Sequence, residues 1–126
     1  MGHTHDNVKE LVEVIHAAEA VVVGAGSGLS TAAVLTYDGE RFRRHFSDFI
    51  EARGFTDMYT AGFFPFPTLE EQWAYWSRHI WYNRYVKAPK DTYKKLLKLL
   101  GCKDFFVLTT NVDHQFQLAG FPKERL

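Results

Sequence analysis

The N-terminal third of the chain predicts a helix, a strand and a second helix. Apolar residues recur at helical spacing along its first segment: Val8, Leu11, Val12, Ile15 and Ala18. This pattern predicts a helix with Asp6 or Asn7 as its N-cap. The run Ala20–Val23 is mostly β-branched and has no polar alternation, which favours a strand buried on both faces. Gly24 ends this run, and we expect a short helix from Ser30 to Val34, directly after the glycines.

The middle of the chain is rich in aromatic residues, and its patterns predict helices. One helical stripe ends near Gly54 and consists of Phe42, Phe46, Phe49 and Ile50. After Pro67, Thr68 and Glu71 form a capping box. The helix that it starts is expected to bury Leu69, Trp73, Trp76 and Ile80. Pro89 breaks the pattern, and Asp91 or Thr92 restarts a helix that buries Tyr93, Leu96, Leu97 and Leu100 and ends at Gly101.

The last part of the chain predicts a second buried strand, Phe105–Thr109, followed by a turn and a short helix within Val112–Ala119. Gly120 and Pro122 end that helix. Two strands do not make a stable parallel sheet, so we expect the remaining strands to lie beyond Leu126. The predicted fold class is α/β, with an incomplete Rossmann-type parallel sheet. We expect residues 1–126 to be the N-terminal part of a larger domain, and residues 35–103 to be a mostly helical insertion.

Composition and charge narrow the function classes. The 126 residues fit one domain or a piece of one. Fifteen basic and fifteen acidic residues cancel, which argues against nucleic acid or an anionic membrane as partner. Cys102 is the only cysteine, which excludes an internal disulfide and a multi-thiolate zinc site within this chain. No apolar run could span a membrane and none resembles a secretory signal, so we expect a cytoplasmic protein.

Lysines are concentrated in the second half of the chain. They are Lys87, Lys90, Lys94, Lys95, Lys98 and Lys103. A solvated helix face is the favoured interpretation, and a partner-binding patch is the alternative.

A glycine-rich turn, Gly24-Ala25-Gly26-Ser27-Gly28, follows the first strand. Glycines allow the backbone to approach a pyrophosphate closely, and the N–H groups at the next helix can hold the anion. A turn without a ligand is the alternative. An ordinary dehydrogenase unit is disfavoured, because that unit needs a second strand within about 30 residues, whereas the next strand here begins near Lys103.

A polar segment, Thr110-Asn111-Val112-Asp113, follows the second strand. Ligands of open α/β sheets bind at the carboxyl ends of the strands, so both loops fall at the expected edge. Asn111 can hold a ribose hydroxyl or a water, and Asp113 can accept from ribose hydroxyls or loop N–H groups. A turn with a helix N-cap is the alternative for both residues.

Together, these two segments resemble the sirtuins. The first match is Gly24-Ala25-Gly26 with Ser30-Thr31-Ala32-Ala33, and the second is Thr110-Asn111-Val112-Asp113. The segment Tyr37–Phe42, the helix containing Trp73–Arg78 and the stretch Thr109–Phe121 resemble the class M branch, which is linked to macrodomain proteins. The resemblance covers nearly the whole chain from Ala20 onward.

The resemblance implies a Rossmann-type NAD-binding domain that cleaves the nicotinamide–ribose bond of NAD. Most sirtuins deacylate proteins, whereas class M members are associated with mono-ADP-ribosylation of protein substrates, including lipoylated carrier proteins. By this resemblance, Gly24, Ala25, Gly26 and Ser30 would hold the diphosphate. Thr31, Ala32 and Ala33 would line the nicotinamide-ribose side. Thr110, Asn111, Val112 and Asp113 would contact ribose and nicotinamide, with Asn111 also catalytic.

Aromatic residues of the loop after the first motif are expected to exclude water, with Tyr37 and Phe42 as candidates. Two features depart from the family. Val34 replaces the usual glycine, and the family's catalytic histidine, a glutamine in class M, has no position here. A zinc site would also lie beyond Leu126. We expect His114 to be incidental, and His45 and His79 to be helix residues rather than metal ligands.

Two other interpretations stay open. The chain could be a non-catalytic module that binds NAD or ADP-ribose, or an inactive truncated remnant. Binding without nicotinamide release would indicate the first, and a molten, aggregating product the second.

Overall fold

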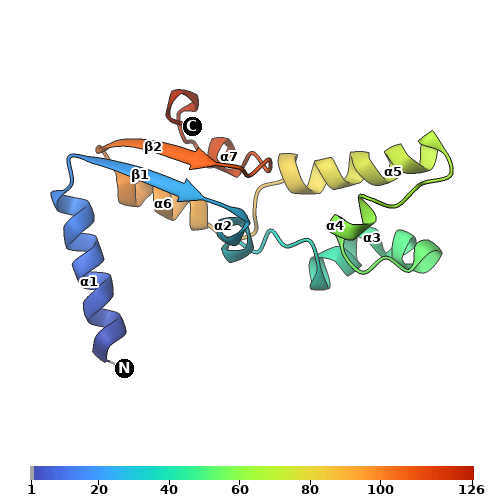
Figure 1. Cartoon of the computed structure of the whole chain (residues 1–126), viewed down its shortest axis with the longest axis horizontal. Coiled ribbons are helices and arrows are strands. Elements are labelled where there is room, and N and C mark those ends of the chain that lie inside the picture. Colours follow the sequence, from blue (N-terminus) through green and yellow to red (C-terminus); the bar gives the residue numbers. More distant parts are fainter. Residues whose placement is uncertain (1) are drawn as a thin grey trace.

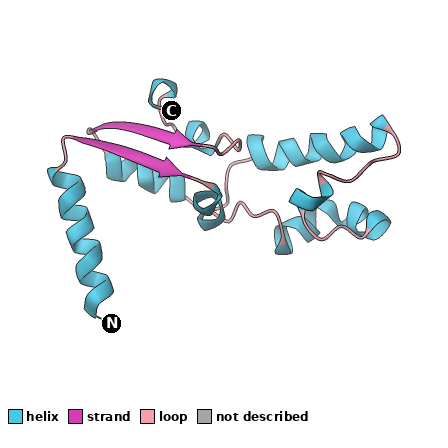
Figure 2. Ribbon diagram, in the orientation of Figure 1, coloured by secondary structure: helices cyan, strands magenta, loops and turns pink. Residues whose placement is uncertain are grey.

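Two parallel strands form the centre of the molecule. The structure is a computed structural model that describes residues 2–126, with side chains from Thr4 onward. Strand β1 (Ala20–Ala25) pairs with β2 (Asp104–Thr109), in a register that runs from Ala20 opposite Asp104 to Ala25 opposite Thr109. All the other elements are helical (Figures 1 and 2). The architecture is therefore mixed α/β, and both predicted strands are confirmed.

One face of this sheet is covered by helices. Helix α6 (Thr92–Leu100) lies along the sheet, and the short helices α2 (Ser27–Ala32) and α7 (Gln115–Leu118) lie near the carboxyl ends of the strands (Figure 1). The buried core beneath consists of Ala33, Tyr93, Leu100, Phe105, Val107, Phe116 and Phe121. These elements are called the sheet part below. Tyr93 and Leu100 are buried as predicted, and α6 ends at Gly101, whose φ is +57°.

The other face of the sheet is open. Val22 is 69% exposed and Leu108 is 59% exposed, and Phe106 lies on the same face. The prediction that both strands are buried on both faces is therefore wrong. Burial alternates along each strand because, within residues 2–126, helices cover only one side.

Helix α1 (Gly2–Ala17) extends away from the sheet (Figure 1). It includes Asp6 and Asn7, so the prediction that one of them is the N-cap is wrong. The sequence has no proline at these two positions that would force the helix to begin at Asp6 or Asn7. Its apolar stripe is largely exposed. The helix is tied to the sheet part at its C-terminal end, where Lys103 Nζ donates to the carbonyls of His16 (2.7 Å) and Ala18 (2.8 Å).

The second part of the molecule, called the helical module, lies at the carboxyl ends of the strands (Figure 1). It consists of α3 (Gly39–Arg53), α4 (Met58–Ala61), α5 (Leu69–Ile80) and the π-helical turn η1 (Trp81–Tyr85). Its core is largely aromatic: Phe42, Phe46, Phe49, Met58, Ala61 and Tyr75. Helix α3 ends at Gly54 with φ +68°, as the sequence predicts.

Helix α5 begins where predicted but buries a different face. Thr68 Oγ1 accepts from Glu71 N at 3.2 Å, which confirms the N-cap, although the Glu71 carboxylate pairs with Arg53 rather than closing the box. Leu69 is 69% exposed and Trp73 is 62% exposed, and Ile80 is also exposed, so the predicted buried stripe is wrong at these positions. Trp76, the fourth predicted residue, is partly buried against the core of the module. Tyr75 is buried instead, because its ring packs against those of Phe46, Phe49 and Phe66.

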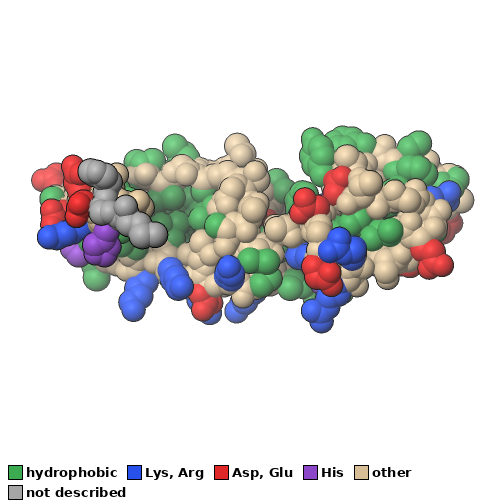
Figure 3. All heavy atoms as spheres, turned by 90° about the horizontal axis from the view of Figure 1, so that it is seen from below, with side chains coloured by type: hydrophobic (Ala, Val, Ile, Leu, Met, Phe, Trp, Pro, Cys, Tyr) green, Lys and Arg blue, Asp and Glu red, His purple; other side chains and the backbone are tan. Residues whose placement is uncertain are grey.

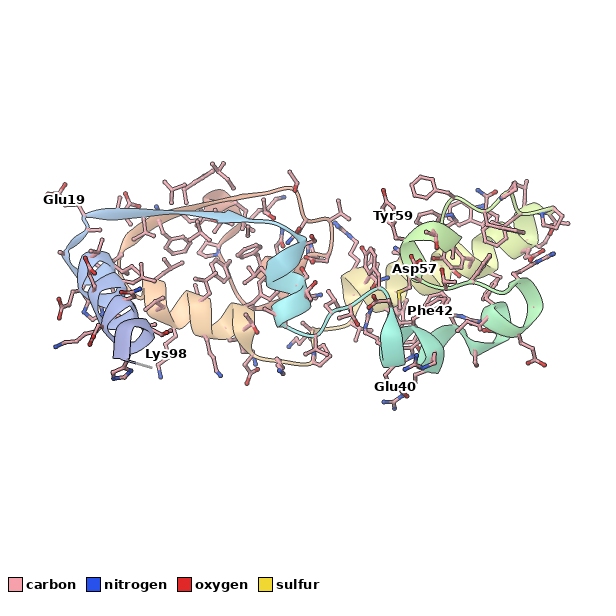
Figure 4. All side chains as sticks on the ribbon, turned by 60° about the horizontal axis from the view of Figure 1, so that its bottom comes forward. Glu19, Glu40, Phe42, Asp57, Tyr59 and Lys98 are labelled. Atoms are coloured by element: carbon pink, nitrogen blue, oxygen red, sulfur yellow. The ribbon has the colours of Figure 1, made fainter. Side chains whose placement is uncertain are left out.

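The surface carries charge and apolar area in separate places. Lys94, Lys95 and Lys98 are exposed on α6, and Figure 4 shows Lys98 on its outer side. Figure 3 shows hydrophobic side chains gathered on the helical module and basic side chains along one edge of the view. The exposed Cys102 follows α6. Between residues 2 and 126 no helix has both the length and the apolar character needed to cross a bilayer.

Candidate functional site

The loops that follow the two strands lie side by side. Thr109 Oγ1 donates to the Ala25 carbonyl at 2.8 Å, and Asn111 Nδ2 donates to the Gly26 carbonyl at 2.8 Å. Asn111 N in turn donates to Thr109 Oγ1 at 3.0 Å. This arrangement follows from the parallel register, because Ala25 and Thr109 are the last paired residues of the sheet. The structure thus brings together two segments that are about eighty-five residues apart.

Ser30 is the centre of a buried polar network between the loops. Its hydroxyl donates to the Asp113 carboxylate and lies 2.7 Å from the Tyr93 hydroxyl. Asn111 Nδ2 approaches Ser30 Oγ at 3.4 Å. The pKa of Tyr93 is raised, mainly because the hydroxyl is buried and also because of the charge of Asp113. The hydrogen bond with Ser30 opposes this shift. Because each polar group has a partner, the network fixes the relative position of both loops.

Asp113 also has a local structural role. Its Oδ1 accepts from Gln115 N at 3.2 Å, at the start of α7. The turn-and-cap interpretation of Asp113 therefore holds for one oxygen, while the other oxygen binds Ser30. His114 adopts φ +60° at the N-cap position of α7 and its side chain makes no capping hydrogen bond.

A cleft of about 550 Å³ opens beside this network. Its lining comes from both loops and from the start of the helical module: Ser27, Ser30, Thr31, Leu35, Thr36, Tyr37, Asp38, Asp57, Thr110, Asn111, Val112 and Asp113. The surface is hollowed between the two parts of the molecule (Figure 3). Clefts of a few hundred Å³ are typical of small-molecule sites.

Six of the predicted site residues line the cleft: Ser30, Thr31, Thr110, Asn111, Val112 and Asp113. Gly24, Ala25 and Gly26 lie at the end of β1, next to Ser27, which lines it. The structure does not place Ala32 and Ala33 among the lining residues. Ala32 is exposed, and Ala33 is completely buried in the core of the sheet part because it closes α2 against α6.

The glycines of the first loop are not required by the chain's own packing. A Cβ at Gly24, Gly26 or Gly28 would meet no atom within 4 Å, and none of the three has a positive φ. Gly26, for example, has φ −119° and ψ −166°, which any residue can adopt. The space that the absent Cβ atoms leave is the space that a closely approaching ligand needs.

The far wall of the cleft is formed by the segment that enters the helical module. The Tyr37 carbonyl accepts from Met58 N at 2.8 Å, and the Tyr37 ring makes an edge contact with His79, with centroids 5.4 Å apart. Burial raises the pKa of Tyr37, and the charge of Asp113 raises it further. Phe42, the second water-excluding candidate, is 2% exposed in the core of the module, so that prediction is wrong (Figure 4).

Arg41 fixes this wall to the helical module. Its Nη1 donates to the Thr36 carbonyl and to Asn83 Oδ1, both at 2.7 Å, and its Nη2 donates to the Tyr82 carbonyl at 2.5 Å. Burial lowers the pKa of Arg41. Within residues 2–126 its partners are neutral oxygens rather than carboxylates, so it acts as a bridge between two backbone segments.

Two further histidines, His45 and His79, are packed within the helical module. The His45 ring stacks on Tyr82 with centroids 3.8 Å apart, and His79 Nδ1 lies 3.3 Å from the Tyr75 hydroxyl. Burial lowers the pKa of His79, and the positive charge of Arg41 lowers it further. In the described part of the chain, no group of three or more His, Cys, Asp or Glu residues is arranged to hold a metal ion.

Two residues that hold the loops together, Tyr93 and Gln115, carry no functional signal in the sequence. Helical spacing predicts Tyr93 only as a core residue of α6, although a hydroxyl in an otherwise Leu- and Lys-rich stripe is a hint of a polar role. Gln115 connects the second loop to the segment before α6: its Oε1 accepts from Ala88 N at 2.8 Å and its Nε2 donates to the Val86 carbonyl at 3.0 Å. Such long-range contacts have no local sequence signature.

Similar proteins are known for most of the chain, although no protein-family model matches it. A "Protein ADP-ribosyltransferase" of Staphylococcus aureus is 38% identical over 107 residues, which are 85% of this chain and 34% of that protein. A "Probable bifunctional ADP-ribose hydrolase/ADP-ribosyltransferase" of Fusarium oxysporum is 36% identical over 123 residues, 90% of this chain and 19% of that protein. The chain thus spans about a third and a fifth of the lengths of these relatives, and its relationship is to proteins named for ADP-ribosyl transfer.

Proposed function

We propose that the cleft binds NAD and that the protein is part of an NAD-dependent ADP-ribosyltransferase of the sirtuin type, with a Rossmann-type sheet. One observation carries this proposal. Two loops at the carboxyl ends of adjacent parallel strands join across Ser30, and the glycines of the first loop leave open space where a diphosphate would approach. The names of the relatives support ADP-ribosyl transfer.

In this proposal, the first loop holds the diphosphate. Gly24 and Gly26 would allow close approach, and N–H groups at the start of α2 would donate to the anion. The adjoining Ser27 and Thr31 supply hydroxyls from the cleft wall. Asn111 and Asp113 face the ribose that carries nicotinamide.

Cleavage of the nicotinamide–ribose bond requires stabilisation of a developing positive charge. When the nicotinamide–ribose bond breaks, the ribose carbon gains oxocarbenium character, and nearby carbonyl and carboxylate oxygens lower the energy of that state. Asp38, Asp57 and Asp113 all line the cleft. The polar network holds Asn111 and Asp113 in fixed positions, so little reorganisation is needed when the charge develops.

Transfer of ADP-ribose to a protein is preferred here over deacylation, because both relatives are named for ADP-ribosyl transfer. The acceptor would be a protein, and a lipoylated carrier protein is the candidate that the class M resemblance suggests. A bound NAD would serve as the donor and would be consumed.

The test combines binding with turnover. Titration calorimetry with NAD should show binding to the 126-residue chain. The full-length protein, incubated with labelled NAD and a lipoylated carrier protein, should show nicotinamide release and label transfer. In the full-length protein, Asn111→Ala should lower nicotinamide release by at least about a hundredfold, the range for loss of one charge-stabilising group, while the melting temperature stays close to that of the wild type. Absence of NAD binding would refute the proposal.

Glycine variants test the first loop separately. Gly26→Ala should leave the fold intact, because the added Cβ meets no atom within 4 Å, but should weaken NAD binding at least about tenfold by obstructing the diphosphate. Gly62→Ala is the matched control for stability: its Cβ would lie 3.1 Å from the Trp76 ring, so it should lower stability without a direct effect on the cleft. Unchanged NAD affinity in Gly26→Ala would contradict the proposed role of the loop.

A non-catalytic binding module is the second candidate function. It is favoured if NAD or ADP-ribose binds with measurable affinity while no nicotinamide is released. The measurement of nicotinamide release described above distinguishes the two functions directly.

A further inference from the structure

Tyr37 offers a polar group to the cleft that the chain itself does not use. The residue lines the cleft, and its side chain is partly buried. Within residues 2–126 its hydroxyl forms no hydrogen bond, although the hydroxyls of Tyr75 and Tyr93 both do. Among the described residues no buried side-chain oxygen lacks a partner, so the Tyr37 hydroxyl is open to solvent. A ligand in the cleft could therefore replace water as its hydrogen-bond partner.

The position of Tyr37 is fixed rather than free. Its carbonyl accepts from Met58 N, and its ring rests edge-on against His79. The preceding Thr36 carbonyl is held by Arg41. Backbone and ring are therefore anchored on the helical module, while the hydroxyl remains available to the cleft. Such pre-positioning lowers the entropic cost of a hydrogen bond to a ligand.

The charges around Tyr37 indicate which end of the ligand lies there. Two opposite charges act on the Tyr37 hydroxyl, those of Asp113 and Arg41. Asp113 lines the cleft together with Asp38 and Asp57, whereas Arg41 does not line it and donates to neutral oxygens. Figure 4 shows Asp57 at the start of α4, on the side of the module that faces the sheet part. This surrounding of carboxylates favours a cationic ring over a neutral one. In NAD, the nicotinamide ring is cationic and the adenine ring is neutral.

We propose that Tyr37 is a specificity-determining residue whose hydroxyl hydrogen-bonds the nicotinamide end of NAD, on the opposite wall from Asn111 and Asp113. This inference rests on the proposed function. The hydroxyl can both donate and accept, which suits a carboxamide that carries an N–H₂ donor and a carbonyl acceptor. The first loop contacts the part of the ligand that NAD shares with ADP-ribose, whereas Tyr37 contacts the part that ADP-ribose lacks.

The test compares two ligands across three forms of the 126-residue chain: wild type, Tyr37→Phe and Tyr59→Phe. Calorimetry measures the affinity of each form for NAD and for ADP-ribose. Tyr37→Phe keeps the ring and its contact with His79, so the thermal transition should not change. It should weaken NAD binding about five- to tenfold, the equivalent of one hydrogen bond, and leave ADP-ribose binding unchanged. Tyr59 is exposed on α4 and does not line the cleft, so Tyr59→Phe should bind both ligands as the wild type does.

Each other outcome is informative. If Tyr37→Phe binds NAD as tightly as the wild type, or loses NAD and ADP-ribose equally, the role of the hydroxyl at the nicotinamide end is refuted while NAD binding stands. If the wild type binds neither ligand, the proposed function and this inference are both refuted.

Discussion

At the scale of single residues, Val34 occupies a conformation that suits glycine. It has φ +64° directly after α2, at the C′ position where glycine normally ends a helix. Its N–H still donates to the Thr31 carbonyl at 2.9 Å, so the helix end is formed despite a β-branched side chain. The left-handed region costs an L-residue about 1–2 kcal/mol. The valine is thus tolerated at a cost to stability.

Val34→Gly should therefore stabilise the protein. We expect its free energy of unfolding to exceed that of Val34→Ala by about 1 kcal/mol, because alanine keeps the Cβ that crowds the backbone. Urea denaturation followed by circular dichroism measures both variants. The alanine variant is the matched control, since both substitutions remove the same isopropyl contacts. Equal stability of the two variants would show that the backbone at this position is unstrained.

The hydroxyl pair between Tyr93 and Ser30 is a second residue-scale feature. The pair links α6 to the first loop through a buried bond of 2.7 Å. A double-mutant cycle with Tyr93→Phe and Ser30→Ala should give a coupling energy of about 1 kcal/mol, as expected for a buried hydrogen bond between neutral groups. Thermal or urea unfolding of the four proteins provides the values. Additive effects would mean that the two hydroxyls do not depend on each other.

At the scale of elements, the sequence predicts where the helices lie better than it predicts which face of each helix is buried. The Thr68 cap and the glycines that end α3 and α6 are local signals, and the structure confirms them. The stripe Leu69, Trp73 and Ile80 failed because helical spacing gives a face but does not say whether a partner covers it. Tyr75 is buried by rings that come from α3 and from the segment 55–66, which no local pattern could indicate.

In the candidate site too, local features were predictable from the sequence and long-range contacts were not. The two loops were predictable because each follows a strand, and the carboxyl ends of parallel strands share one edge. The network partners Tyr93 and Gln115 were missed because their contacts span 63 and 27 residues of sequence. Tyr37 was singled out as a loop residue, and it does line the cleft. Phe42 was singled out together with it, although its helical spacing with Phe46 already favoured the core position that it occupies.

Helix α1 depends on one lysine for its attachment to the sheet part. Lys103 Nζ binds two carbonyls at the C-terminal end of α1, where a cation is also favoured by the helix dipole. Lys103→Met should increase the rate of amide hydrogen exchange in α1 severalfold and leave the exchange of β2 unchanged. Lys98→Met, an exposed lysine of α6, is the control. Equal exchange in α1 for both variants would show that Lys103 does not hold the helix.

The packing of α5 on the rest of the helical module should depend on pH through His79. Burial and Arg41 place the folded-state pKa of His79 below its ordinary value of 6.5. Below pH 6.5 the unfolded state binds a proton at His79 more readily than the folded state does. The contribution of neutral His79 to the free energy of unfolding is therefore complete above pH 6.5 and is lost as the pH falls. The free energy of unfolding should decrease between pH 6.5 and about pH 5. His79→Gln should make this slope shallower in urea titrations; an unchanged slope would exclude His79 as the source.

At the scale of the whole molecule, two cores with different chemistry meet at one cleft. The core of the sheet part forms on one face of two strands, and the core of the helical module is built from stacked and edge-on aromatic rings. The connections between them are the segments around Thr36 and around Val86 (Figure 1). Arg41 joins the first of these segments to the helical module, because it binds the Thr36 carbonyl on one side and Asn83 Oδ1 and the Tyr82 carbonyl of η1 on the other.

Loss of Arg41 should destabilise the helical module more than the sheet part. Because Trp73, Trp76 and Trp81 are the only tryptophans and all lie in the helical module, tryptophan fluorescence reports on the module. Circular dichroism reports on both parts. In the wild type the two signals should follow one transition, whereas in Arg41→Met the fluorescence transition should occur at lower urea concentration. The cost to the module should be about 3 kcal/mol, because one partly buried cation donates to three oxygens.

Arg43→Met is the matched control for this loss of charge. Arg43 is exposed on the same helix and forms only an exposed i,i+3 pair with Glu40 at 3.3 Å, so its removal should change stability by less than about 0.5 kcal/mol. NAD affinity adds an independent readout, because the Thr36 carbonyl that Arg41 holds precedes Tyr37 on the cleft wall. Arg41→Met should weaken NAD binding even at urea-free conditions where both parts are folded. If the two spectroscopic transitions of Arg41→Met still coincide and its NAD affinity equals that of Arg43→Met, the Thr36 segment and η1 are held by contacts other than those of Arg41.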